Sequence, residues 1–162
     1  MSAQKFLLLR ADIDRTLAQV AAVVTEGRET LEGLDESPTT LELRGIGSIL
    51  HDFYTGIEQL LEHIASELDG EIPVGADWHV QLLGRMTSAI ESVRPAVLSS
   101  DLADALRPYL RFRHLFRNIY GTQLRWELCR GLATEMGDVW EKFHGEMEAF
   151  KDVLKSLHAG CS

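Results

Sequence analysis

The 162-residue chain is poor in the residues that cross-link or interrupt a fold, with two cysteines and four prolines. Cys129 and Cys161 stand far apart and offer neither a disulfide framework nor a CxxC metal pair, which favours a reducing compartment. Near the start, only a four-residue apolar run precedes the first charges, which is too short for a signal-peptide core or a membrane span. We therefore expect a cytoplasmic protein that does not associate with a membrane.

Sequence patterns typical of a metal site or a nucleotide-phosphate loop are also missing. His51, His63 and His79 occur in neither an HxxxH nor an HExxH arrangement, so surface or packed histidines are the simpler interpretation. Gly45 and Gly47 lie within helix-patterned sequence rather than in a Walker-type loop. The sequence thus predicts no metal and no cofactor.

Composition and periodicity favour helices. Hydrophobic residues make up 45% and charged residues 25% of the chain, as in ordinary globular proteins, and the length suits a single domain over residues 1–162. No internal repeat, low-complexity run or strand-like alternation is present. We expect an all-α fold, an up-and-down bundle of about five helices joined by short loops.

Apolar residues at three- and four-residue steps place the five helices. The predicted spans are residues 4–34, 40–69, a third from Asp77 to Arg94 at the latest, a fourth from residues 99–101 to near Gly121, and a last from 124 to about 157. The stripe of the third helix includes Trp78, Leu82, Met86 and Ile90. Pro108 is expected to kink the fourth helix, and the glycines of the second suit close helix packing.

One segment, residues 107–130, opposes the charge of the rest of the chain. It contains six of the sixteen basic residues, all of them arginines, and a single acid, Glu127, so its local charge is +5 in a chain of net charge -9. Arginine is the side chain suited to bidentate contact with phosphate. A concentrated positive segment on an acidic protein indicates a dedicated site for an anion.

Helical projection of residues 107–120, at about 100° per residue, separates two faces. The predicted apolar face comprises Tyr109, Phe112, Leu115, Phe116 and Ile119. The polar face comprises Arg107, Arg111, Arg113, His114, Arg117, Asn118 and Tyr120. Arg113 and Tyr120, seven residues apart, lie nearly one above the other. A solvated face whose arginines pair with the abundant acids remains an alternative interpretation.

The string Arg113-His114-Leu115-Phe116-Arg117-Asn118-Ile119-Tyr120 resembles the signature of HEPN-domain proteins, in particular HepT-like toxins. That signature places a histidine four to six positions after an arginine and a tyrosine two residues further on. Residues 53–58 (FYTGIE), Pro73 and the pair Trp78-His79 resemble landmarks of a HepT-like branch. The likeness covers roughly residues 40–130.

The resemblance implies a metal-independent RNase that is active as a homodimer. It implies that Arg113 contacts the scissile phosphate and that a histidine assists proton transfer. From the concentration of positive charge, we predict that Arg107, Arg111 and Arg117 add phosphate contacts. It also implies a type VII-like toxin–antitoxin system, in which a nucleotidyltransferase antitoxin of the MNT type transfers AMP to Tyr120. An adenylate beside Arg113 would occupy the phosphate site and block RNA.

One position departs from the signature, because Asn118 stands where the motif histidine is expected. An asparagine amide does not shuttle protons near neutral pH. Either His114 takes that role, or Asn118 only orients substrate, or the chain is a catalytically weak or inactive subunit that binds nucleotide or RNA beside a nucleotidyltransferase. Besides the RNase and the non-catalytic binding subunit, a third possible function is that of a plain helical interaction protein. We therefore predict Arg113, His114 and Asn118 as the catalytic set.

Overall fold

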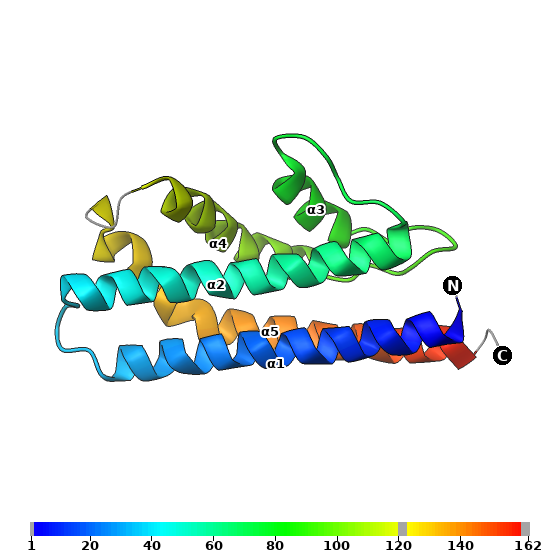
Figure 1. Ribbon diagram of the computed structural model, residues 1–162, viewed down its shortest axis with the longest axis horizontal. Helices are drawn as coiled ribbons and strands as arrows, with labels where there is room; N and C mark the ends of the chain where they lie inside the picture. The colour runs from blue at the N-terminus through cyan, green and yellow to red at the C-terminus, as the bar shows by residue number, and fades with distance from the viewer. Residues whose placement is uncertain (1, 120–122, 160–162) are drawn as a thin grey trace.

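The computed structural model describes residues 2–119 and 123–159, and its regular elements are helices (Figure 1). In chain order they are α1 (Ala3–Glu32), α2 (Thr40–Ile64), the π-helix η1 (Ala65–Asp69), α3 (Trp78–Met86), α4 (Ser100–Asn118) and α5 (Trp126–Ala159). The described residues contain no strand, only an isolated bridge between Ile90 and Arg94. Successive long helices α1, α2, α4 and α5 alternate in direction (Figure 1). The predicted all-α bundle of five helices is confirmed.

The helix starts follow from capping side chains. Ser2 precedes α1, and its side chain accepts a hydrogen bond from the Lys5 amide. Thr39 and Glu42 form a reciprocal capping box at the start of α2, with distances of 3.2 and 3.1 Å. Ser99 accepts from the Leu102 amide and starts α4. These caps satisfy amides that a helix leaves unpaired at its first turn.

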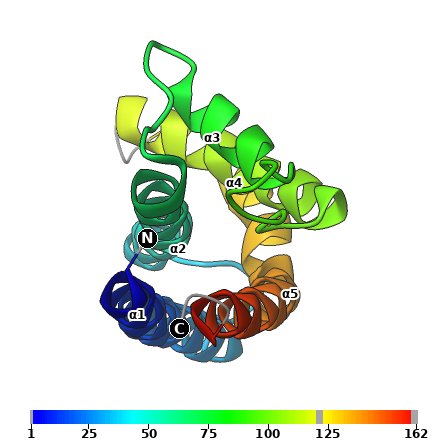
Figure 2. The same cartoon turned by 90° about the vertical axis from the view of Figure 1, so that its right-hand side faces the viewer.

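Helix α2 is the central element of the bundle, because it packs on α1, α3, α4 and α5. The end-on view shows α1 beside α5, with α2 adjoining α1 and with α3 and α4 on the opposite side of the molecule (Figure 2). The apolar stripe of α2 is almost completely buried, as Leu50, Phe53 and Ile57 illustrate. Phe53 of this stripe packs edge-on against Tyr109 of α4, with 5.2 Å between ring centroids.

Two glycines of α2 permit the close packing that the sequence suggested, and a third does not. A Cβ atom at Gly47 would lie 2.8 Å from the Phe116 ring, and one at Gly56 would lie 2.7 Å from Val20. A Cβ atom at Gly45 would meet nothing within 4 Å. Because Gly47 has no side chain, the Phe116 ring packs directly against α2, which holds the end of α4 on the bundle.

The third helix is shorter than predicted, because it ends at Met86 instead of continuing through Ile90. The Thr87 hydroxyl donates to the carbonyl of Gly84 at 2.8 Å and closes the last turn. Residues 87–99 then form an irregular segment in which Ser92 adopts a φ of 61°. Apolar periodicity alone could not reveal this end, since Ile90 continues the pattern.

A buried ion pair holds that irregular segment in place. The Arg94 guanidinium donates to both carboxylate oxygens of Asp69, at 2.6 and 2.9 Å, and also to the carbonyls of Ser88 and Pro95. The Arg94 side chain is fully buried and that of Asp69 is 3% exposed. This pair joins the end of η1 to the segment that connects α3 with α4.

The second, fourth and fifth helices agree closely with the predicted spans. The predicted helix 40–69 is formed by α2 and η1, and Gly70 ends it with a φ of 78°. Helix α4 is continuous through Pro108 and ends at Asn118, close to the predicted end near Gly121. Across the described residues, no helix is long and apolar enough to cross a membrane.

Candidate functional site

The two faces of α4 correspond to the predicted separation, with one exception. Tyr109 and Phe112 are buried, and Phe116 and Ile119 are half-buried against the core. Leu115 was predicted on the same apolar face, but it is 38% exposed. Its assignment to the core side was wrong, because Leu115 lines the cleft beside α4 while Phe116 and Ile119 pack against the core.

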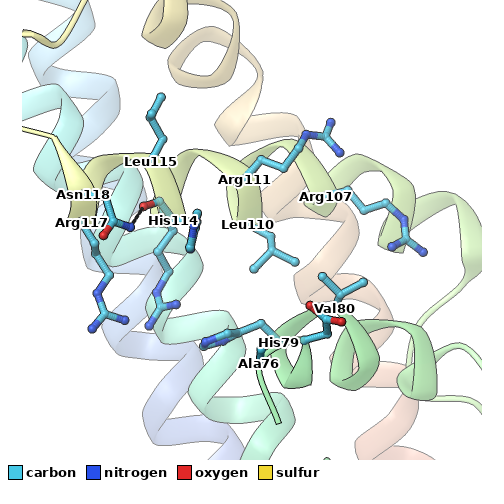
Figure 3. A pocket seen from close by; sticks show the side chains of 12 residues that line it. Ala76, His79, Val80, Arg107, Leu110, Arg111, His114, Leu115, Arg117 and Asn118 are labelled. Carbon is cyan, nitrogen blue, oxygen red and sulfur yellow. Dashed lines mark hydrogen bonds between the residues drawn. The ribbon is translucent and has the colours of Figure 1, made fainter.

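A cleft of about 750 Å³ lies between α3 and the polar face of α4 (Figure 3). All the predicted catalytic and phosphate-binding residues line it, namely Arg107, Arg111, Arg113, His114, Arg117 and Asn118. Ala76, Asp77, His79 and Val80 line it from the α3 side. The cleft thus gathers four arginines and two histidines around one space. This local concentration of positive charge favours an anionic ligand. It stands out because the chain as a whole has a net charge of -9.

Arg113 is the most strongly fixed arginine of the cleft. Its Nε donates to the Thr55 hydroxyl at 2.9 Å, and its Nη1 lies 3.4 Å from Oε1 of Glu58. Its side chain is 13% exposed, whereas that of Arg107 is 39% exposed. Two contacts on α2 therefore hold the Arg113 guanidinium at the wall of the cleft before any ligand arrives. A cation fixed in this way needs little reorganisation to meet a phosphate.

Glu58 links the arginine to a histidine on the other wall. Its carboxylate is 4% exposed, and its Oε2 accepts a hydrogen bond from Nδ1 of His79 at 2.8 Å. The Trp78 ring stacks on the His79 ring with 3.8 Å between centroids. We call Arg113, Glu58 and His79 the Arg–Glu–His network. Three different helices contribute to it: α4, α2 and α3.

The remaining arginines differ in how they face the cleft. Arg107 pairs with Asp104, one turn earlier on α4, at 3.2 Å. Arg117 extends toward the α3 side of the cleft, whereas Arg111 points away from α3 (Figure 3). Of the three predicted phosphate contacts, Arg117 is thus directed toward the cleft and Arg111 lies at its edge.

His114 and Asn118 lie one turn apart at the end of α4. His114 is exposed and points from α4 toward the side on which His79 lies (Figure 3). The Asn118 amide donates to the backbone carbonyl of His114 at 2.7 Å. This bond ties the amide to the last helical turn, so in this conformation Asn118 helps to end the helix. Tyr120 lies outside the described residues, so its alignment with Arg113 stays a prediction.

Tyr54 lies in the core beside the network. Burial, together with the Glu58 carboxylate, raises the pKa of Tyr54 well above its ordinary value, although Arg113 and Arg107 oppose the shift. The phenol therefore stays protonated at physiological pH.

Among residues 2–119 and 123–159, no three histidine, cysteine, aspartate or glutamate side chains gather as candidate metal ligands.

Glu58, Thr55 and His79 received no functional role from the sequence alone. All three belong to the segments that carried the family resemblance, residues 53–58 and the pair Trp78-His79. Their proximity to Arg113 depends on how α2, α3 and α4 pack, since Thr55 and Arg113 are 58 positions apart in the sequence. The available signal was therefore the resemblance itself, not local spacing.

Comparison with known proteins identifies a family for the chain. The family model described as "HepT-like protein" matches residues 45–154, which is more than half of the chain. No curated protein and no solved structure matches it. The matched span contains all three residues of the Arg–Glu–His network, together with the whole of α3 and α4. The chain therefore belongs to the HepT-like proteins, which are of the HEPN type.

Proposed function

We propose that this HepT-like protein is the toxin of a type VII-like toxin–antitoxin pair and that it cleaves RNA in the α3–α4 cleft without a metal ion. The observation that carries the proposal is the gathering of four arginines and two histidines around one cleft of about 750 Å³. RNA offers the complementary chemistry, a chain of phosphates flanked by 2'-hydroxyls. The proposal includes a cytoplasmic location and a homodimer whose two α4 helices face a common space.

Arg113 is the proposed contact to the scissile phosphate. Charge builds on the non-bridging oxygens as the 2'-hydroxyl attacks phosphorus, and a fixed guanidinium stabilises that charge. Thr55 and Glu58 hold Arg113 in position, whereas exposed Arg117 is free to follow the flanking phosphates. His114 assists proton transfer, because histidine changes protonation near neutral pH and this one lines the cleft.

The proposed control of the toxin is covalent. A nucleotidyltransferase antitoxin of the MNT type would transfer AMP from ATP to the Tyr120 hydroxyl and release pyrophosphate. Tyr120 is three positions after Arg117 in the sequence, and the proposal is that its adenylate competes for the arginines of the cleft. Its phosphate would compete with RNA for the same cations.

A second candidate is a subunit that binds nucleotide or RNA without cleaving it. Asn118 favours this function, since it occupies the motif position of the histidine and its amide is bound to the helix backbone. The arginines would then retain their anion-binding role. The two candidates differ in turnover and not in the ligand class.

The deciding experiment incubates purified protein with RNA in EDTA and follows both cleavage and binding. We expect cleavage by the unmodified protein, loss of cleavage in Arg113→Ala, and full activity in Arg15→Ala. Arg15 is a matched control because it forms an exposed ion pair on α1, a helix that contributes no residue to the cleft. Intact RNA that is nevertheless bound would favour the second candidate. If reversing the charges of Arg113 and Arg117 affected neither RNA binding nor partner binding, both candidates would be wrong.

A separate measurement tests the antitoxin. A nucleotidyltransferase of the MNT type, incubated with ATP and the protein, should add mass in AMP units. The increase should vanish in Tyr120→Phe. An unchanged mass with an active nucleotidyltransferase would contradict the proposed covalent control and leave the RNase proposal standing.

A further inference from the structure

We infer that His79, oriented by Glu58, is the general base of the cleft and supplies the proton acceptor that Asn118 does not. This inference rests on the proposed RNA cleavage and adds a catalytic residue to it. Cleavage through the 2'-hydroxyl needs two proton movements, one away from the nucleophile and one toward the leaving group. His114 alone serves only one of them at a time, and the cleft contains a second histidine.

The hydrogen bond to Glu58 determines which nitrogen of His79 faces the reaction. An ionised carboxylate only accepts hydrogen bonds, so Nδ1 of His79 carries the proton in the 2.8 Å contact with Oε2. In the neutral ring the lone pair is then on Nε2. Among the residues that the structure describes, none forms a hydrogen bond with Nε2. A carboxylate behind the ring also stabilises the imidazolium that forms when Nε2 takes up a proton.

The position of His79 is as well defined as its tautomer. The side chain is 24% exposed and lines the cleft, so a ligand in the cleft can reach it. Trp78 stacks on one face of the ring at 3.8 Å and restricts its rotation. In Figure 3, His79 extends from α3 into the space toward which His114 points from α4. The two histidines thus approach one space from opposite walls.

Glu58 places the base and the phosphate contact relative to each other. One oxygen of its buried carboxylate faces Arg113 and the other accepts from His79. A phosphate bound by Arg113 is therefore brought next to the histidine that the same carboxylate orients. Buried charged groups of this kind, satisfied on both sides, are well suited to keep catalytic side chains in register.

The reaction balances with these two histidines and no other reactant. Nε2 of neutral His79 takes the proton of the 2'-hydroxyl, and the 2'-oxygen forms a bond to phosphorus. The bond between phosphorus and the 5'-oxygen breaks, and the imidazolium of His114 gives its proton to that oxygen. The products are a 2',3'-cyclic phosphate and a 5'-hydroxyl. His79 then loses its proton to water and His114 regains one, which restores both starting states.

The central test is the kinetics of His79→Asn on an RNA substrate. The asparagine amide stands near the place of Nδ1 and can still donate to Glu58, but it provides no proton acceptor. We expect kcat to fall by about 10² to 10⁴, the usual contribution of general acid–base catalysis, with KM little changed. The acidic limb of the pH–rate profile should disappear, and added imidazole should restore part of the rate of His79→Ala.

A matched control separates the chemistry from folding. His63 is also half-exposed and hydrogen-bonded to a carboxylate, Asp12 at 3.1 Å, but it does not line the cleft. His63→Gln should retain the kcat and pH profile of the unmodified protein. Circular dichroism and thermal unfolding should give the same folded state for both variants.

The outcomes distinguish this inference from the function on which it rests. If the unmodified protein cleaves RNA and Arg113→Ala does not, yet His79→Asn keeps its kcat and its acidic limb, the inference is wrong and the proposed function stands. An increase in KM with unchanged kcat would also overturn it, since His79 would then only bind RNA. If the unmodified protein does not cleave RNA at all, the proposed RNase function fails and takes the inference with it.

Discussion

Replacing Arg94 by methionine should destabilise the protein strongly, although Arg94 does not line the cleft. Methionine preserves much of the aliphatic volume and removes the guanidinium. Asp69 would then remain 3% exposed with no cation beside it. The carbonyls of Ser88 and Pro95 would lose their donor as well. The substitution therefore leaves a buried carboxylate and two backbone carbonyls without the donor that satisfied them.

The expected cost follows from the burial of the pair. Removing one partner of a buried ion pair costs about 3 to 5 kcal/mol, most of it the desolvation of the remaining charge. Because Arg94 is fully buried and its contact with Asp69 is bidentate, we expect the free energy of unfolding to fall by about 4 kcal/mol. For a chain of this length the melting temperature should fall by about 8 to 16 °C, at roughly 2 to 4 °C per kcal/mol.

Urea unfolding followed by circular dichroism measures the effect. Arg15→Met serves as the control, since the side chain of Arg15 is 68% exposed and its ion pair with Asp12 should contribute less than about 1 kcal/mol. The double variant Arg94→Met/Asp69→Leu should recover most of the loss, because replacing a whole buried pair by apolar side chains is often neutral. A loss below about 1 kcal/mol in Arg94→Met would refute the reasoning, because it would mean that Asp69 is hydrated or neutral without its partner.

Three further predictions concern packing and titration. Gly47→Ala should cost about 1 to 3 kcal/mol by overpacking, whereas Gly45→Ala, which meets open space, should be neutral or stabilising by up to about 1 kcal/mol in thermal unfolding. Burial raises the pKa of the Cys129 thiol to about 11. In the Cys161→Ser variant, where Cys129 is the one remaining thiol, Ellman's reagent should react at pH 8 only after unfolding in urea. Fast reaction in native buffer would contradict this prediction. Burial also raises the pKa of Tyr54 above the ordinary 10.0, so its contribution to stability is complete below pH 10 and is lost as the pH rises further. Urea titrations between pH 8 and 11 should show that loss, and Tyr54→Phe should reduce it.

The long helices could be predicted because their signal is local. Phe6, Leu9, Ile13 and Leu17 recur at helical steps in the sequence, and all four are buried in the structure. The end of α3 could not be predicted in this way. Ile90 continues the apolar period, but the chain turns there because Arg94 reaches across to the end of η1.

The candidate site divides in the same manner. The cationic face of α4 follows from the 3.6-residue period, and the structure gathers its described members at one cleft. The contributions of Glu58 and His79 depend on contacts between α2, α3 and α4, which no local pattern encodes. Their roles in catalysis, like those of Arg113 and His114, stay predictions until kinetics test them.

The nine-residue α3 gives the cleft a stability different from that of the bundle. It supplies His79 from the outside of the molecule, where the preceding loop exposes Val74 to 82% (Figures 1 and 2). Short elements with few buried side chains open at lower free energies than the core does. Amide hydrogens of α3 should accordingly exchange with solvent faster than those of α2. The cleft would then come apart on heating or in mild denaturant while the four long helices are still assembled, so a melting temperature would overestimate the range over which the cleft is intact.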